Sequence, residues 1–153
     1  MLKIFRFMVF LFFFYYKTVN VLIFPLYFCM ISTNQHEEVK MMIYTEKVIP
    51  FENRAGGKGT GILRIAMEDE QLEGRAKAIM SVTLHPGSSI GSHQHVGNLE
   101  IYYVLKGEGI FTVNGKSEPI HAGQAGSMNP GDWHSIENTG SEDMLISAVI
   151  LYE

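Results

Sequence analysis

Cysteine and positive charge are both scarce in this sequence. Cys29 is the only cysteine among the 153 residues, so the chain cannot form an internal disulfide. The scarcity of thiols fits a reducing compartment, and we expect the protein to be cytoplasmic. Residues 41–153 hold 8 Lys and Arg against 14 Asp and Glu, a formal charge of 8 − 14 = −6. An acidic domain without a basic patch argues against nucleic acid or an anionic membrane surface as a partner.

An uninterrupted apolar run of membrane-spanning length is also missing. Lys17 and Asn20 help to divide the hydrophobic residues 1–40 into apolar runs of 10 (Phe7–Tyr16) and 11 (Val21–Ile31) residues. Each run falls short of the roughly 20 residues that a spanning helix needs. The segment also lacks the small-x-small cleavage site of a signal peptide.

We interpret residues 1–40 as translated upstream sequence. They are rich in residue types with AT-rich codons, and Glu37–Lys40 could be encoded by a purine run that resembles a bacterial ribosome-binding site, directly before Met41 and Met42. The alternative is a genuine membrane or export segment, which would make the protein membrane-anchored or exported. The predicted organisation is an extension at 1–40 and a single domain at 41–153.

Short strands dominate what remains. From residue 75 onward, runs of β-branched and aromatic residues are separated by Gly, Pro and Asn, which predicts an antiparallel sandwich or barrel. Residues 75–84 alternate between apolar and polar positions, Asn114-Gly115 predicts a tight hairpin, and residues 123–126 are expected to turn. Residues 67–74 are expected to form at most one helical turn. The fold class is therefore all-β.

Histidines and one glutamate are spaced as metal ligands would be. His93 and His95 are two residues apart, so on a strand they face the same side. Glu100 has an odd offset from His95, but the intervening Val-Gly-Asn turn lets it start a new strand aimed at the same point. His134 heads a later strand and is the expected fourth ligand.

Three neutral imidazoles and one carboxylate make a mixed nitrogen and oxygen site. Such a site suits one divalent transition metal, with Mn or Fe favoured and Ni, Zn or Cu as alternatives. In an octahedral metal, four protein ligands leave positions open for water or substrate, unlike a closed structural zinc site.

The same residues resemble the two motifs of the cupin family. The first motif, G-x5-H-x-H-x3–4-E-x6-G, is matched at every fixed position, from Gly87 to Gly107. The second, G-x5-P-x-G-x2-H-x3-N, is matched from Gly123 to Asn138 except at Asn129, where the motif has proline, and this departure bears on the aim of His134. The resemblance covers residues 75–151 and is similar in its compact spacing to small single-domain bacterial cupins.

The resemblance implies a β-jelly-roll barrel with His93, His95, Glu100 and His134 as ligands inside it. It further implies a metal-dependent enzyme that acts on a small carboxylate or oxygen-rich molecule, of the decarboxylase, dioxygenase or isomerase type. Oxalate-decarboxylase-like is a label by analogy with the fold. The alternative is a non-catalytic module that binds a small ligand or metal. Cupins frequently dimerise, so a homodimer is expected.

Residues beyond the metal ligands are harder to assign from sequence. Tyr102 shares the face of Glu100 and is expected to line the barrel interior. Arg64 is the one basic residue in an apolar run and could bind a substrate carboxylate through two hydrogen bonds. Trp133 is expected to pack beside the site. No general acid or base can be assigned, so the catalytic residues are unknown.

Overall fold

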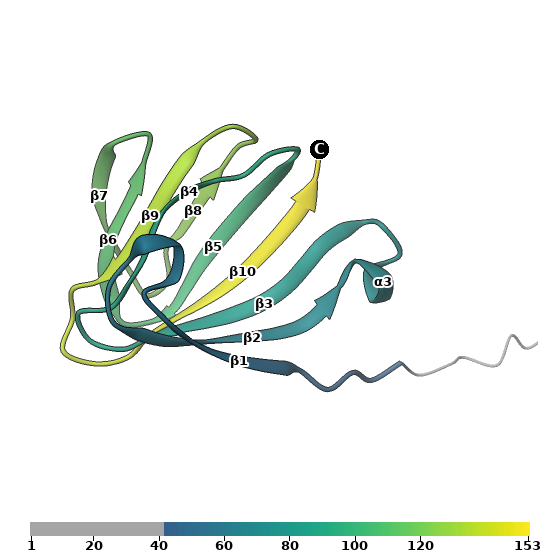
Figure 1. The fold of residues 1–153 in the computed structure, drawn as a ribbon, viewed down its shortest axis with the longest axis horizontal. Coiled ribbons are helices and arrows are strands. Elements are labelled where there is room, and N and C mark those ends of the chain that lie inside the picture. The colour runs from purple at the N-terminus through teal and green to yellow at the C-terminus, as the bar shows by residue number, and fades with distance from the viewer. Residues whose placement is uncertain (1–41) are drawn as a thin grey trace, which may run out of the picture. The chain divides into compact units, whose positions relative to one another are not determined.

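The computed structural model describes residues 42–153. The predictions for residues 1–40 lie outside these residues and stay predictions. Ile43–Glu153 form one compact unit, and Figure 1 shows it as two layers of strands. None of the helices in the described residues has the length and apolar character needed to cross a membrane.

Six strands form the larger sheet, in the order β1-β2-β3-β10-β5-β8. They are β1 (Lys47–Glu52), β2 (Thr60–Glu68), β3 (Ala76–Leu84), β10 (Met144–Tyr152), β5 (Asn98–Lys106) and β8 (Ala125–Met128). Every pair of neighbours is antiparallel.

Four strands form the smaller sheet, in the order β4-β9-β6-β7, again antiparallel throughout. They are β4 (Ser89–Gln94), β9 (Trp133–Asn138), β6 (Glu108–Val113) and β7 (Lys116–His121). Two antiparallel sheets with almost no helix confirm the predicted all-β jelly-roll.

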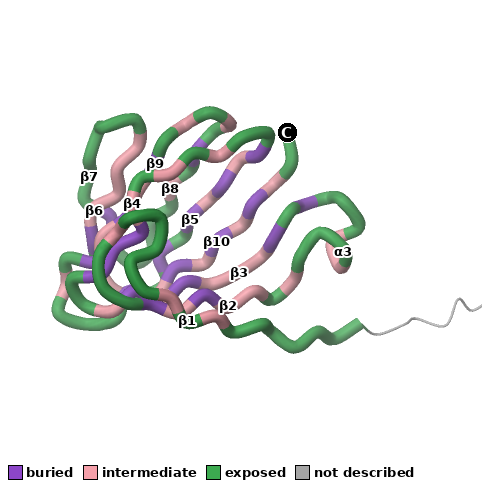
Figure 2. Tube along the Cα trace, in the orientation of Figure 1, coloured by how far each residue is buried: buried purple, intermediate pink, exposed green. Residues whose placement is uncertain are grey.

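The core lies between the two sheets. Along β10, Met144, Ile146, Ala148 and Ile150 are buried, while the residues between them are half-buried. This alternation follows from the two-residue period of a strand, and Figure 2 shows the same banding on neighbouring strands. The alternation predicted for residues 75–84 is confirmed in β3.

Turns and short helical segments connect the strands. The predicted hairpin joins β6 to β7, where Asn114 (φ 49°) and Gly115 (φ 80°) both adopt left-handed backbone angles. Two positive φ angles are what a type I′ turn requires, which explains the Asn-Gly pair. The single helical turn expected near residue 70 is α3 (Asp69–Leu72), and a short 3-10 turn, η1 (Arg54–Gly56), follows β1.

One local prediction was wrong. Residues 123–126 were expected to turn, but Ala125 and Gly126 begin β8 and pair with β5. A Cβ on Gly126 would lie 2.9 Å from the Cδ1 atom of Phe111. The ring of Phe111 therefore fills the space beside the strand, and the glycine marks close packing rather than a turn.

Candidate metal centre

Four side chains meet between the two sheets. His93 belongs to β4 and His134 to β9, and the register of these two strands places them directly opposite each other. His95 follows the end of β4, and Glu100 comes from β5 in the other sheet. One donor atom from each residue lies within 4.8 Å of the others. The structure thus brings together all four residues that the sequence predicted.

Hydrogen bonds fix which ring nitrogen of two histidines faces the cluster. His93 donates from Nδ1 to the Gly91 carbonyl at 2.9 Å. His95 donates from Nδ1 to Oδ1 of Asn98 at 2.6 Å, because the amide nitrogen of Asn98 is already committed to the Val96 carbonyl at 2.9 Å. A neutral imidazole carries one proton, so the Nε2 atom of each ring keeps a free lone pair.

Several donor atoms of the cluster are buried without a hydrogen-bond partner. They are Nε2 of His95, Oε2 of Glu100 and both ring nitrogens of His134. Oε2 of Glu100 lies 2.9 Å from Nε2 of His95 and 3.3 Å from Nε2 of His134. Lone pairs that face a carboxylate repel it, and each unsatisfied buried polar group costs about 1–3 kcal/mol. A cation among these atoms would remove both penalties, so the residues present fit a metal ion.

The electrostatics keep the ligands in the form that a metal requires. Burial, followed by the neighbouring His93 and His95, lowers the pKa of His134 from 6.5 to about 3. Burial also lowers the pKa of His93. Both rings are therefore neutral near pH 7, with lone pairs available. Burial raises the pKa of Glu100, and the charge of His95 opposes that rise.

A cavity of about 340 Å³ opens beside the cluster. Its polar end is formed by His93, His95, Glu100 and Tyr102. Small-molecule sites span roughly 300–1,000 Å³, so this cavity suits a molecule of a few atoms rather than a nucleotide or an oligosaccharide. The apolar part of the wall is made by Leu63, Ile65, Ala78, Met80, Val82, Ile90 and Ile150.

Tyr102 lies where the sequence placed it. Its ring is 2% exposed, lines the cavity, and has its centroid 5.5 Å from that of His134. Burial, followed by the charge of Glu100, raises the pKa of Tyr102 well above its ordinary value. The phenol therefore keeps its proton and can donate a hydrogen bond.

Arg64 is not brought to the cavity. Leu63 and Ile65 of β2 face inward, so Arg64 between them faces the outer side of the sheet. There it donates to Thr83 at 3.1 Å and lies 3.5 Å from a carboxylate oxygen of Glu46. The arginine that does line the cavity is Arg54, which begins η1.

Trp133 is a second correction. It precedes His134 on β9, and the two-residue period of a strand turns it outward, leaving it 50% exposed. It does not pack beside the cluster.

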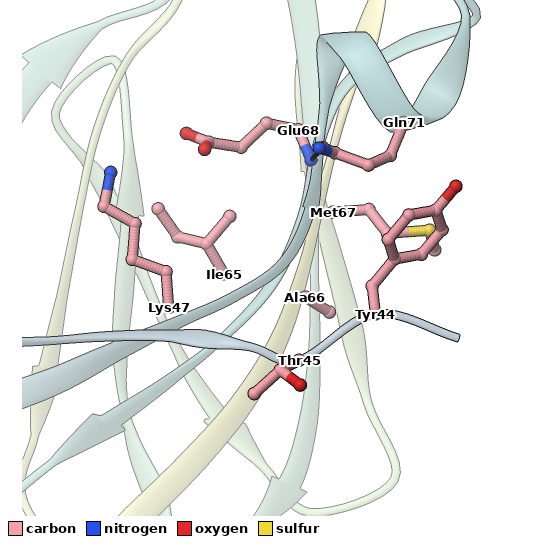
Figure 3. A pocket seen from close by; sticks show the side chains of 8 residues that line it. All are labelled: Tyr44, Thr45, Lys47, Ile65, Ala66, Met67, Glu68 and Gln71. Atoms are coloured by element: carbon pink, nitrogen blue, oxygen red, sulfur yellow. Dashed lines mark hydrogen bonds between the residues drawn. The ribbon is translucent and has the colours of Figure 1, made fainter. Parts of the chain in front are cut away.

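A second, smaller hollow of about 130 Å³ shares two lining residues with the cavity. Figure 3 shows its lining, in which Ile65 and Glu68 of β2 also belong to the larger cavity. The side chains of Lys47, from β1, and Glu68 lie on the same side of this hollow. None of the four residues of the metal cluster lines this hollow.

Comparisons with known proteins agree with this geometry. The family model described as a cupin domain matches residues 80–150. The oxalate-binding protein of Thermotoga maritima is 40% identical over 117 residues, which cover 75% of this chain and 97% of that protein. The chain therefore belongs to the cupin family.

Two further relatives extend the comparison. A crystal structure described as a predicted oxalate decarboxylase from Thermotoga maritima is 40% identical, with a TM-score of 0.68, over 74% of this chain and all of that one. The transcriptional regulator PuuR of Escherichia coli is 38% identical over 68 residues, which are 44% of this chain and 36% of that protein.

Proposed function

We propose that this cupin domain holds one divalent transition metal through His93, His95, Glu100 and His134, and binds a small carboxylate such as oxalate against it. The observation that carries the proposal is the set of buried, unpartnered donor atoms at the polar end of a cavity. The name of the Thermotoga relative, oxalate-binding protein, supports the choice of ligand.

The chain's own residues have distinct tasks in this proposal. Three neutral imidazoles and the Glu100 carboxylate bind the ion, and the apolar wall excludes water around the ligand. The protonated hydroxyl of Tyr102 donates to the Glu100 carboxylate and helps to hold this ligand group in place. The metal supplies Lewis-acid chemistry to an oxygen-rich ligand, or redox chemistry if it is iron.

Metal content of the purified full chain tests the first half of the proposal. We expect about one equivalent of a transition metal by mass spectrometry, with Mn or Fe favoured over Ni, Zn and Cu. His93→Ala should abolish binding of this metal. His121→Ala is the matched control, because this exposed ring bonds only the neighbouring Ala122 carbonyl. A wild-type protein that neither contains nor takes up metal would overturn the proposal.

Two activities are compatible with such a centre. The first is metal-dependent conversion of the carboxylate by an enzyme of the decarboxylase, dioxygenase or isomerase type. The second is non-catalytic binding, which the name of the oxalate-binding relative and the likeness to part of a transcriptional regulator favour. Incubation of the metal-loaded protein with oxalate separates them. Formation of formate and carbon dioxide establishes an enzyme, whereas intact oxalate bound at one equivalent establishes a binding protein.

We further propose a cytoplasmic homodimer. The outer face of β5 exposes Tyr103 (44%) and Leu105 (48%), and its neighbour β10 carries the half-buried Leu145 and Val149 on the outer side. A second copy could cover this apolar strip. Light scattering of the full chain should give twice the monomer mass. The Leu105→Glu variant should give a lower measured mass.

A further inference from the structure

Unpaired positive charge gathers at the cavity, although the domain is acidic. Most of the eight Lys and Arg among residues 42–153 have a carboxylate partner. These pairs involve Lys58, Arg64, Arg75, Lys106 and Lys116. Among the described residues, Lys47, Arg54 and Lys77 have no such partner. Two of these three, Arg54 and Lys77, line the cavity beside the metal cluster.

Arg54 is held in place by its own segment. In η1, Ala55 adopts a left-handed backbone conformation (φ 51°), and the Arg54 carbonyl accepts a hydrogen bond from the amide of Gly57 at 2.9 Å. The guanidinium lies 5.7 Å above the ring of Phe51, within the range of a cation–π contact. The side chain is therefore supported without using its hydrogen-bond donors on a carboxylate.

The same segment is tied to the strand that carries His93. Residues 57–60 bond to β4 and the turn before it: the amide of Lys58 donates to Oγ of Ser89 at 2.9 Å, and the amide of Ser89 donates to the Lys58 carbonyl at 2.8 Å. Arg54 and the metal cluster are thus parts of one hydrogen-bonded frame.

The charges at the rim leave a net positive excess. Arg54 and Lys77 contribute two positive charges, and Glu68 contributes one negative charge. Apart from Tyr102 at the polar end, the other lining residues outside the cluster are apolar. An anionic group at this end of the cavity can therefore bind only to the cationic side chains, and a guanidinium can bind a carboxylate through two parallel hydrogen bonds.

We propose that the ligand of this site carries two anionic groups, one bound at the metal cluster and the other on Arg54, so that Arg54 selects short dicarboxylates over monocarboxylates. The assignment rests on the proposed function and adds the ligand class to it. Lys77 also lines the cavity, but its ammonium group lacks the planar pair of donors that a guanidinium offers to a carboxylate.

Calorimetric titration of the metal-loaded full chain tests this assignment. The probes are oxalate, malonate and succinate as dicarboxylates, with formate and acetate as monocarboxylates. We expect Arg54→Gln to weaken dicarboxylate binding by about tenfold or more, which is the effect of losing one charge-assisted contact of about 1.5–3 kcal/mol. Monocarboxylate binding should change by less than about threefold, and metal content should not change.

Two further variants sharpen the result. Arg54→Lys should recover only part of the dicarboxylate affinity, because one charge remains but the paired donors are lost. Arg64→Gln is the matched control: it removes the same charge from the outer face of the sheet and should leave both ligand classes unaffected.

The outcomes separate this assignment from the proposed function. If the wild type binds dicarboxylates and Arg54→Gln binds them equally well, the role of Arg54 is wrong while the proposed function stands. An equal loss of affinity for dicarboxylates and monocarboxylates also contradicts selection by Arg54. If the metal-loaded wild type binds no carboxylate at all, the proposed function fails and this assignment falls with it.

Discussion

At the scale of single residues, the side chain of Asn98 makes two hydrogen bonds that orient His95. Its amide nitrogen donates to the Val96 carbonyl and its oxygen accepts from Nδ1 of His95. The residue is 6% exposed, so water cannot readily replace either bond. A group that accepts a hydrogen bond from a metal-binding histidine in this way fixes the tautomer of the ring and raises its basicity.

Removing that orientation gives the first prediction at this scale. Asn98→Ala should weaken metal affinity by about 10- to 100-fold, because His95 loses the acceptor that fixes its tautomer. Competition with a fluorescent chelator measures the effect. Gln124→Ala is the control, since the side-chain oxygen of this exposed glutamine accepts a hydrogen bond from the backbone amide of His121, which is not part of the cluster. Equal metal affinities in the two variants would contradict the orienting role of Asn98.

The ligand residues could be predicted from sequence because their signal is local. His93, His95 and Glu100 lie within eight consecutive residues, and the two-residue period of a strand decides which side chains converge. The arginine could not be chosen in the same way. Arg54 and Arg64 both lie near the start of the domain, and only the packing of the loop at residues 53–59 against β4 shows which one faces the cavity.

At the scale of secondary structure elements, two glycines allow the Arg54 segment to approach β4. A Cβ on Gly91 of β4 would meet the Ala55 carbonyl oxygen and would lie 2.6 Å from the amide nitrogen of Gly57. A Cβ on Gly57 would in turn lie 2.7 Å from the amide nitrogen of Gly91. Backbone atoms cannot yield as the end of a flexible side chain can, so only glycine permits this contact.

Gly91→Ala should therefore displace the segment that carries Arg54. We expect a loss of about 1–3 kcal/mol in the free energy of unfolding, as for other overpacked sites, together with weaker dicarboxylate binding. Urea denaturation and calorimetry measure the two effects. In Gly140→Ala, the control, the added carbon meets the side chains of Glu108 at 3.3 Å and Asn138 at 3.4 Å, and the nearest backbone atom, the Glu108 carbonyl oxygen, is 3.7 Å away. Unchanged stability and binding in Gly91→Ala would refute the role of this contact.

Most elements were predictable, and the exceptions have a common cause. A strand with an apolar face toward the core, such as β3, was recognised from its alternation of apolar and polar residues. β8 was missed because Gly126 resembles a turn residue until Phe111 of another strand is seen to cover it. Trp133 was misplaced because its neighbour in sequence faces the opposite side of β9. Contacts between distant segments decide these cases, and a single sequence does not contain them.

At the scale of the whole molecule, the metal cluster links folding to pH. His134 is fully buried and its pKa is lowered from 6.5 to about 3, so the folded, metal-free protein cannot readily protonate it. The unfolded chain takes up that proton below pH 6.5. The unfolded state therefore binds more protons than the folded state between pH 6.5 and about 3, and stability must fall as the pH falls through this window.

In the presence of a metal chelator, His134 alone should lower the free energy of unfolding of the wild type by roughly 3 kcal/mol between pH 7 and pH 4. This value follows from about 1.36 kcal/mol per pKa unit. Glu100 acts in the opposite sense, because burial raises its pKa and favours the protonated folded state. His134→Gln isolates the histidine contribution, since Glu100 is common to both proteins. The stability difference between wild type and variant, measured by urea denaturation at each pH, should therefore shrink on acidification. Parallel pH profiles would mean that His134 is protonated in the folded state as readily as in the unfolded chain. In that case burial would not be the cause that keeps this imidazole neutral in the folded protein.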